Sequence, residues 1–248
     1  MCQGSIILHI PHSRPDIPDD VRRGILLNDA DLRRELLRMT DWYTDELFDT
    51  GVGTAIVYHF SRLVADPERF ADDADEPMSA KGMGAIYTRT SGGLILRQID
   101  SIGRAELMCR YYWPHHERLG ATVAGILENY GHCLIIDCHS FNSMPLLQEL
   151  DQAVPRPDIC LGTDLFHTPE GLVRGVENAF REKGLISKRN SPFSGTLVPS
   201  VFFHKDERIR SIMIEVQRAL YMDEATGQKN AQFERIKTTI GNIIKSIF

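Results

Sequence analysis

Two histidines and one glutamate lie at the ends of apolar runs in this sequence. His12 lies just past the run SIILHI, His139 lies just past CLII, and Glu215 ends the run SIMIE. Two histidines and one carboxylate can hold zinc and leave one coordination position for water. A further carboxylate can take a proton from that water, and Glu215 is our candidate for this base. A structural ion pair between Glu215 and Arg218 is the alternative interpretation.

The oxygen ligand of such a site has several candidates. We favour Asp41, in the segment TDWYTDELF, with Asp45 and Glu46 as alternatives one turn further along the same predicted helix. Asp137 lies two residues before His139. It is therefore either a ligand in place of His139 or a partner that orients His139.

The elements that must position these residues alternate along the chain. Strands are predicted at residues 5–10, 53–60, 132–141, 158–164 and 211–220, and helices at residues 28–51 (in two pieces), 104–131, 168–184 and 224–248. This order predicts an α/β fold, a single three-layer domain over residues 1–248 with a mostly parallel central sheet. Such sheets bind ligands beyond the carboxyl ends of their strands, so we expect the polar residues at the strand ends to meet at one edge.

The composition argues against several classes of function. The chain has 248 residues, of which 42% are hydrophobic, and a formal net charge of −6. This acidic balance argues against a broad nucleic-acid surface, and no run reaches the roughly 18 apolar residues of a membrane span. The five cysteines form no CxxC pair, which favours reduced thiols. With no recognisable signal peptide, we expect a soluble, cytoplasmic protein.

Several segments together resemble one protein family. They are HIPHS, TDWYTDELF, SRLVADPERF, YYWPHHERL, LIIDCHSF, NSPFSGT and IMIEVQRALYMDE. In this order and at this spacing, the chain resembles the N-formylglutamate amidohydrolase family almost from end to end. Three positions depart from the family pattern: Arg14 replaces the usual Gly, Glu68 the usual Asn, and His115 the usual Tyr.

The resemblance implies a fold, a metal and a reaction. The family is similar in fold to zinc carboxypeptidases (phosphorylase/hydrolase-like) and to zinc-dependent cell-wall amidases. It implies one zinc per chain on His12, Asp41 and His139, with Glu215 as general acid and base. His116 is our candidate donor to the oxyanion. The implied reaction is hydrolysis of N-formylglutamate to formate and glutamate, as in histidine degradation.

The implied substrate is a small dianion, so the pocket needs cations. Arginine binds carboxylates in two-pronged pairs. The candidate substrate-binding residues are Arg62, Arg69, Arg97, Arg218 and Asn190. Arg62 and Arg69 belong to the segment SRLVADPERF, whereas Arg97 and Arg218 are equally compatible with structural ion pairs. Asp66, in the same segment, is expected to orient an arginine.

Two other functions fit the same residues. One is a zinc amidase for another N-acyl amino acid or for a peptidoglycan amide, and the other is a binding protein that keeps the fold without the metal. A small, arginine-rich pocket would favour a formyl amino acid, and an open groove would favour a polymer. Retention of His12, Asp41, His139 and Glu215 argues against loss of the metal.

Overall fold

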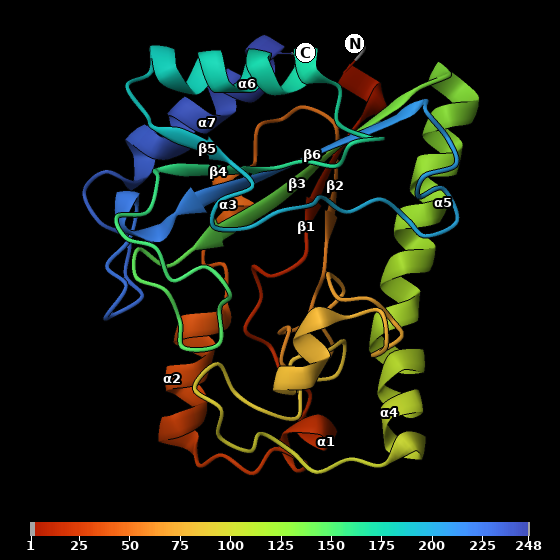
Figure 1. The fold of residues 1–248 in the computed structure, drawn as a ribbon, viewed down its shortest axis with the longest axis vertical. Coiled ribbons are helices and arrows are strands. Elements are labelled where there is room, and N and C mark those ends of the chain that lie inside the picture. Colours follow the sequence, from red (N-terminus) through yellow and green to blue (C-terminus); the bar gives the residue numbers. More distant parts are fainter. Residues whose placement is uncertain (1–2, 248) are drawn as a thin grey trace.

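A computed structural model describes residues 3–247 and contains one six-stranded sheet with the strand order β2-β1-β3-β6-β4-β5 (Figure 1). The strands are β1 (Ile6–Ile10), β2 (Thr54–Val57), β3 (Cys133–Phe141), β4 (Ile159–Gly162), β5 (Ser187–Arg189) and β6 (Ile209–Gln217). β2, β1, β3 and β6 are parallel, and β4 runs antiparallel to β6. The predicted α/β fold with a mostly parallel sheet is therefore confirmed, but the short strand β5 was not predicted.

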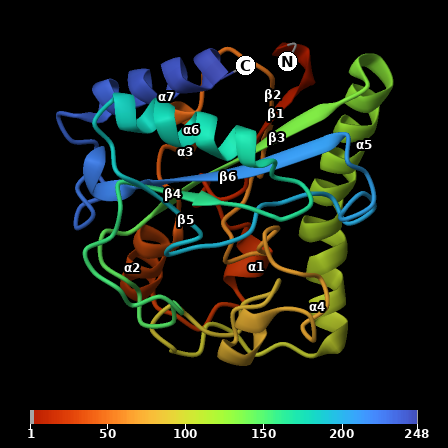
Figure 2. The ribbon, with the colours of Figure 1, turned by 45° about the horizontal axis from the view of Figure 1, so that its top comes forward.

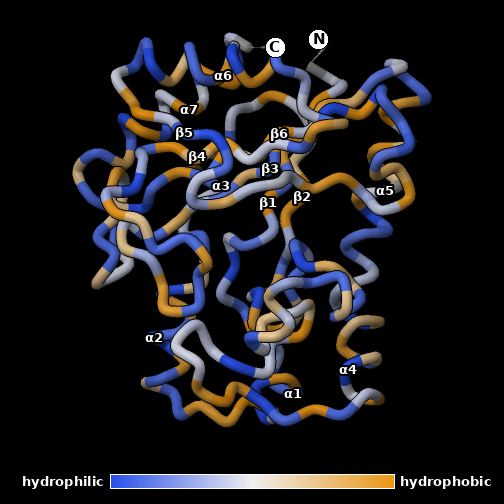
Figure 3. The backbone as a smooth tube through the Cα atoms, viewed as in Figure 1, coloured by the Kyte–Doolittle hydropathy of each residue, from blue (hydrophilic) through white to orange (hydrophobic). Residues whose placement is uncertain are grey.

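Helices cover both faces of the sheet (Figure 2). On one face lie α3 (Thr44–Leu47), α6 (Glu170–Glu182) and α7 (Phe233–Ile247), and on the other lies α5 (Trp113–Tyr130). Apolar and hydrophilic residues alternate along α6 (Figure 3), as expected for a helix with one buried side. The sheet and its two coverings form three layers.

The residues of β3 show which helices pack on each face of the sheet. Ile136 and Cys138 pack with the α6 and α7 cluster, whereas Cys133 and Ile135 pack with α5. Successive side chains of a strand point to opposite faces, so both sets must be apolar and the run reads as continuous. The same alternation places Asp137 and His139 on the α5 side, near the carboxyl end of the strand.

The remaining helices lie beyond the carboxyl ends of the parallel strands (Figure 1). They are α1 (Asp19–Arg22), α2 (Asp29–Met39), the 3₁₀ helix η2 (Pro77–Lys81) and α4 (Ser101–Leu107). A π-helical turn, η3 (Met108–Tyr112), joins α4 to α5. The helix predicted at residues 104–131 is thus divided into three parts, and Pro114 occupies the first turn of α5, where proline is well tolerated.

Neither a disulfide nor a helix that could span a membrane is found among residues 3–247. The described cysteines, Cys109, Cys133, Cys138 and Cys160, are all free thiols, and Cys2 lies outside the described residues. Within residues 3–247, no helix combines the length and the hydropathy that are needed to cross a bilayer.

We expect Leu119→Ala to lower the free energy of unfolding by about 2–5 kcal/mol, the range for a truncated core leucine. Leu119 of α5 is fully buried against the sheet face that carries the polar strand ends. Leu165→Ala is the matched control, because Leu165 is fully exposed and surface changes usually cost within about 0.5 kcal/mol. Urea denaturation measures the free energy of unfolding of both variants. Equal losses of stability would contradict the burial of Leu119 against the sheet.

Candidate active site

The polar residues at the strand ends meet on one face of the sheet. His139 of β3 and Glu215 of β6 are register partners, and His12 follows β1, the other neighbour of β3. All three are buried, and all three line one cavity. The packing of α5 against Cys133 and Ile135 covers the amino-terminal half of this face. The carboxyl half therefore remains for a site.

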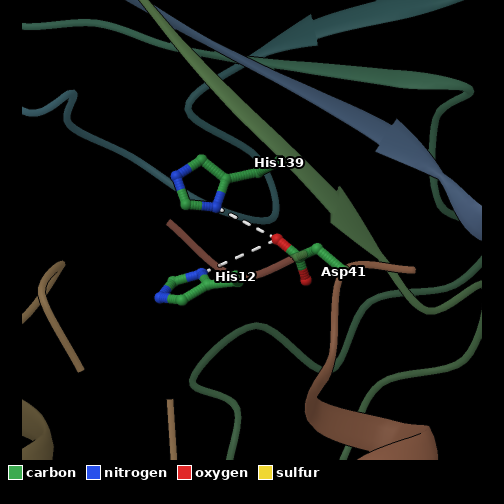
Figure 4. A group of neighbouring side chains, drawn as sticks. All are labelled: His12, Asp41 and His139. Atoms are coloured by element: carbon green, nitrogen blue, oxygen red, sulfur yellow. Dashed lines mark hydrogen bonds and ion pairs between the residues drawn. The ribbon is translucent and has the colours of Figure 1, made fainter. Parts of the chain in front are cut away.

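His12, Asp41 and His139 form a compact group (Figure 4). Asp41 Oδ2 lies 3.2 Å from His139 Nδ1 and 3.6 Å from His12 Nδ1, and the two ring centroids are 5.0 Å apart. The Asp41 amide donates to the His12 carbonyl at 2.9 Å, which fixes the segment after α2 beside the segment after β1. The structure thus brings together the three residues predicted as metal ligands.

The alternative oxygen ligands point elsewhere. Asp45 pairs with Arg14 at 2.8 Å, and Glu46 pairs with Lys229 at 2.6 Å. Neither belongs to a described group of side chains that could hold a metal together with His12. Asp41 is therefore the carboxylate of this group.

A carboxylate holds the far nitrogen of each histidine. His12 Nε2 lies 2.8 Å from Asp66 Oδ1, and His139 Nε2 lies 3.1 Å from Asp137 Oδ1. Such partners fix a ring and leave its other nitrogen free to bind a metal. Asp137 therefore fits the orienting role, and Asp66, which was expected to orient an arginine, also orients His12. Tyr87 donates to Asp66 Oδ2 at 2.6 Å, a contact that no pattern in the sequence indicated.

These residues fit a divalent cation. His12 Nδ1 is buried and has no hydrogen-bond partner among residues 3–247, although buried polar groups are normally satisfied. Burial opposes protonation of His139, but the adjacent Asp137 and Asp41 outweigh it and raise the pKa of this histidine. The group thus combines an unsatisfied nitrogen with an excess of negative charge, and zinc is commonly bound by two histidines and one carboxylate.

Asp41 is held from its other side by Arg218. The guanidinium donates to Asp41 Oδ1 at 2.8 Å, and the Ser140 amide donates to Asp41 Oδ2 at 3.2 Å. Burial opposes ionisation of Asp41, but the two histidines and Arg218 outweigh it and hold the pKa of this carboxyl well below its usual range. Asp41 is therefore an anion in the folded chain.

Glu215 is a separate buried acid beside this group. Burial, reinforced by the charge of Asp41, raises the pKa of Glu215 to about 8, although His139 and Arg218 oppose the shift. The alternative ion pair with Arg218 is not formed, because this guanidinium contacts Asp41 and Ser140 instead. A carboxyl that titrates near neutral pH can both accept and donate a proton.

The cavity has a volume of about 470 Å³, within the range of small-molecule sites. The arginines that line it are Arg38, Arg62, Arg69 and Arg218. Arg62 donates through Nε and Nη2 to Asp66. Arg69 lies 3.6 Å from Asp66 and 3.7 Å from Glu76, and its Nε is unsatisfied in the described part of the chain.

Arg38 was not predicted. It is exposed near the end of α2, lines the cavity, and its guanidinium contacts no other described residue through a hydrogen bond or ion pair. Its position on a charged amphipathic helix resembles that of an ordinary surface arginine. Arg38 differs from an ordinary surface arginine only because α2 lies beside the carboxyl ends of the strands, where the cavity is found.

Three predicted site residues do not line this cavity. Arg97 is buried and donates to the carbonyls of Leu63 and Val64, so its contacts are those of a structural residue. Asn190 exchanges hydrogen bonds with Thr163. His116 packs against the Tyr112 ring with centroids 4.2 Å apart, and burial lowers its pKa to about 4. The positions of these three side chains therefore do not support direct contact with a ligand in the cavity.

Comparison with solved structures first defines the class of fold. A crystal structure of N-formylglutamate amidohydrolase from Ralstonia eutropha JMP134 superposes with a TM-score of 0.85 at 26% identity, covering 98% of this chain and 92% of that one. A gene product from Agrobacterium tumefaciens shares the fold with a TM-score of 0.67 at 18% identity, covering 99% of this chain and 92% of that one. The protein is thus an α/β protein with a buried histidine–carboxylate group at the sheet edge.

Sequence comparison then gives the family. Residues 4–222 match the family described as N-formylglutamate amidohydrolase. An N-formylglutamate deformylase from Pseudomonas putida is 26% identical over 230 residues, which are 88% of this chain and 82% of the relative. The chain belongs to the N-formylglutamate amidohydrolase family, as its segments predicted.

We expect His12→Ala to lose the metal that remains tightly bound after dialysis, because one of the ligand nitrogens is removed. Metal analysis of the purified protein measures this, and circular dichroism checks that the variant is folded. His59→Ala is the control, because His59 is exposed and lies outside the described groups that could hold a metal. A full equivalent of tightly bound metal in the His12 variant would show that the ligand assignment is wrong.

Proposed function

We propose that this protein is a metal-dependent amidohydrolase that cleaves N-formylglutamate to formate and glutamate. The observation that carries the proposal is the group His12, Asp41 and His139 beside Glu215 in a cavity lined by arginines. Membership of the family supports the same reaction. The name of the Pseudomonas putida relative, N-formylglutamate deformylase, supports it too.

His12, Asp41 and His139 would hold the metal, and zinc suits this set of donors. When bound, zinc supplies a Lewis acid and lowers the pKa of a coordinated water towards about 7. Asp66 and Asp137 keep both imidazole rings oriented with Nδ1 towards Asp41. This preorganisation removes the need to reorient the ligands during the reaction.

Glu215 moves the proton in this mechanism. Its carboxylate accepts a proton as water attacks the formyl carbon, and the resulting carboxylic acid then donates this proton to the leaving amine of glutamate. Glu215 suits both steps, because burial raises its pKa to about 8 and a catalytic pKa near the working pH favours proton transfer in either direction.

The arginines would bind the two carboxylates of the substrate. Arg218 is fully engaged with Asp41, Ser140, Asn142 and the Arg38 carbonyl, so it positions Asp41 and does not serve the substrate. Arg69 has an unsatisfied Nε, and the Arg38 guanidinium has no described partner. We assign the substrate carboxylates to these two arginines, with Arg62 contributing the nitrogen that Asp66 does not occupy.

A different N-acyl amino acid is the second candidate substrate. Glu68 lines the cavity and adds a negative charge close to His139, at 3.8 Å. A substrate with fewer negative charges than formylglutamate would meet less repulsion there. A cavity of about 470 Å³ suits an amino-acid derivative better than a peptidoglycan strand.

We expect Glu215→Gln to retain the tightly bound metal and to lose at least about a hundredfold in turnover, as for other positioned acid–base groups. The substitution keeps the shape of the side chain and removes the proton acceptor. Formate release and metal content are measured on the same preparation. Near-normal turnover with full metal content would reduce Glu215 to a structural residue.

We expect Arg69→Lys to raise the KM for N-formylglutamate roughly tenfold, about 1.4 kcal/mol, and to change turnover much less. Lysine keeps the charge but loses the planar fork that binds a carboxylate in two places, and uniform binding is expressed in KM. Arg34→Lys, an exposed change on α2, is the control.

Arg62→Lys should change turnover as well as the KM for N-formylglutamate, because Arg62 also holds Asp66 and thereby His12.

Substrate preference is measured by assaying formylglutamate, formylaspartate, formylglutamine and acetylglutamate side by side with the wild-type protein. Equal rates on formylglutamine and formylglutamate would overturn the dianion assignment.

A further inference from the structure

The turn that carries Asp41 contains a strained residue. Tyr43, two residues further along, has a φ of 66° and a ψ of 10° and lies directly before α3. Side chains other than glycine rarely adopt this left-handed conformation. Where they do, the surrounding structure enforces it, often at a functional site. We propose that Tyr43 is a positioning residue that holds Asp41 in the orientation that binds the metal, an inference that rests on the metal site of the proposed function.

The turn fixes the main chain of Asp41 on both sides. The left-handed residue reverses the chain, so that the amide and the hydroxyl of Thr44 both donate to the Asp41 carbonyl, at 3.2 and 2.9 Å. The Asp41 amide donates to the carbonyl of His12, itself a predicted ligand, at 2.9 Å. The direction in which the Asp41 carboxylate leaves the main chain therefore depends on the conformation of Tyr43.

Two phenol hydroxyls hold the turn in this conformation. Tyr43 donates from its hydroxyl to the Gly227 carbonyl at 2.7 Å, and its ring packs edge-on against Phe233 with centroids 5.6 Å apart. In the opposite direction, the hydroxyl of the buried Tyr221 donates to the Trp42 carbonyl at 3.0 Å. These contacts supply the restraint that a left-handed tyrosine requires.

The segment that receives the Tyr43 hydroxyl is itself fixed. Gly227 has a φ of 77°, and its amide donates to the Asp223 carbonyl at 2.8 Å. A Cβ atom at Gly227 would lie 2.8 Å from the side chain of Leu37 on α2, so this segment packs closely against the helix that precedes Asp41. Residues 4–222 match the family. The position of Asp41 thus depends on a segment outside the matched range.

The strain at Tyr43 should be expressed in metal affinity. Without its anchor, the turn of the metal-free protein can relax to an unstrained conformation, and metal binding must then restore the original one. Reordering of this kind is subtracted from the binding free energy. A purely structural contact would instead lower the free energy of unfolding and leave the zinc affinity of the folded protein unchanged. Metal affinity and stability therefore separate the two roles.

The test is the zinc affinity of the full-length apoprotein, measured with Zn²⁺ in competition with a chromophoric chelator, together with urea unfolding of the same apoprotein. We expect Tyr43→Phe to weaken zinc binding about tenfold, about 1.4 kcal/mol, with little change in the urea midpoint. Tyr111→Phe is the matched control, because it removes a phenol hydroxyl that also makes a hydrogen bond, to Arg110 at 2.8 Å, but packs beside Met108. It should keep the wild-type zinc affinity.

A second pair of variants tests the backbone conformation itself. Tyr43→Gly and Tyr43→Ala both remove the ring and the hydroxyl, but only glycine adopts a positive φ without steric cost. We expect the glycine variant to bind zinc about fivefold more tightly than the alanine variant, since the left-handed conformation is costly for alanine. Circular dichroism checks that both variants are folded.

The outcomes distinguish this inference from the proposed function. Tight zinc binding by the wild type with an unchanged affinity in Tyr43→Phe would overturn the role of Tyr43 alone. Equal zinc affinities in Tyr43→Gly and Tyr43→Ala would also overturn it, because the left-handed backbone would then not control Asp41. A wild-type protein that binds no zinc would overturn the metal site of the proposed function and this inference with it.

Discussion

The buried carboxylate of Asp41 imposes the constraint on which the site depends. An anion removed from water is tolerated only when cations and donors surround it. Its partners are Arg218 after β6, the Ser140 amide of β3, and the imidazoles of His12 and His139. These partners lie on or next to strands that are adjacent in the order β1-β3-β6. Burial of Asp41 therefore depends on the central sheet, which positions these partners around it.

The requirement that a buried anion be surrounded by donors also applies to the residues around Asp41. Each histidine beside it is held by a carboxylate, and each of those carboxylates needs donors of its own. Asp66 receives them from Arg62 and Tyr87, and Asp137 from the Leu197 amide. Burial opposes ionisation of Asp66, but Arg62 and His12 outweigh it and hold its pKa well below the usual range. The position of the His12 ring thus depends on the long loop between β2 and α4. The position of the His139 ring depends on Asp137 of β3 and on Leu197, which lies between β5 and β6.

Local sequence predicted the residues whose position is set by a strand. His12, His139 and Glu215 each interrupt or follow an apolar run, and alternation along a strand fixes the face to which a residue belongs. The sequence was a poor guide to side chains on loops. Arg97 and Asn190 were predicted to face the substrate, yet they satisfy backbone and side-chain groups nearby. Their direction is set by tertiary contacts that no local pattern encodes. The antiparallel direction of β4 was equally invisible, because a strand buried on both faces shows no alternation in either direction.

Alternation along the strands also explains why ionisable residues accumulate at this edge. His9, Asp137, His139 and Glu215 lie at register positions that share the α5 side of the sheet. The packing of α5 covers the apolar residues nearer the amino ends of the strands and reaches His9 through His115, whereas His139 and Glu215 line the cavity. Each added carboxylate lowers the cost of a nearby cation and raises the cost of leaving the others unpaired. Glu68, brought in by the loop, adds one more negative charge to this face. This face therefore concentrates negative charge around the group His12, Asp41 and His139.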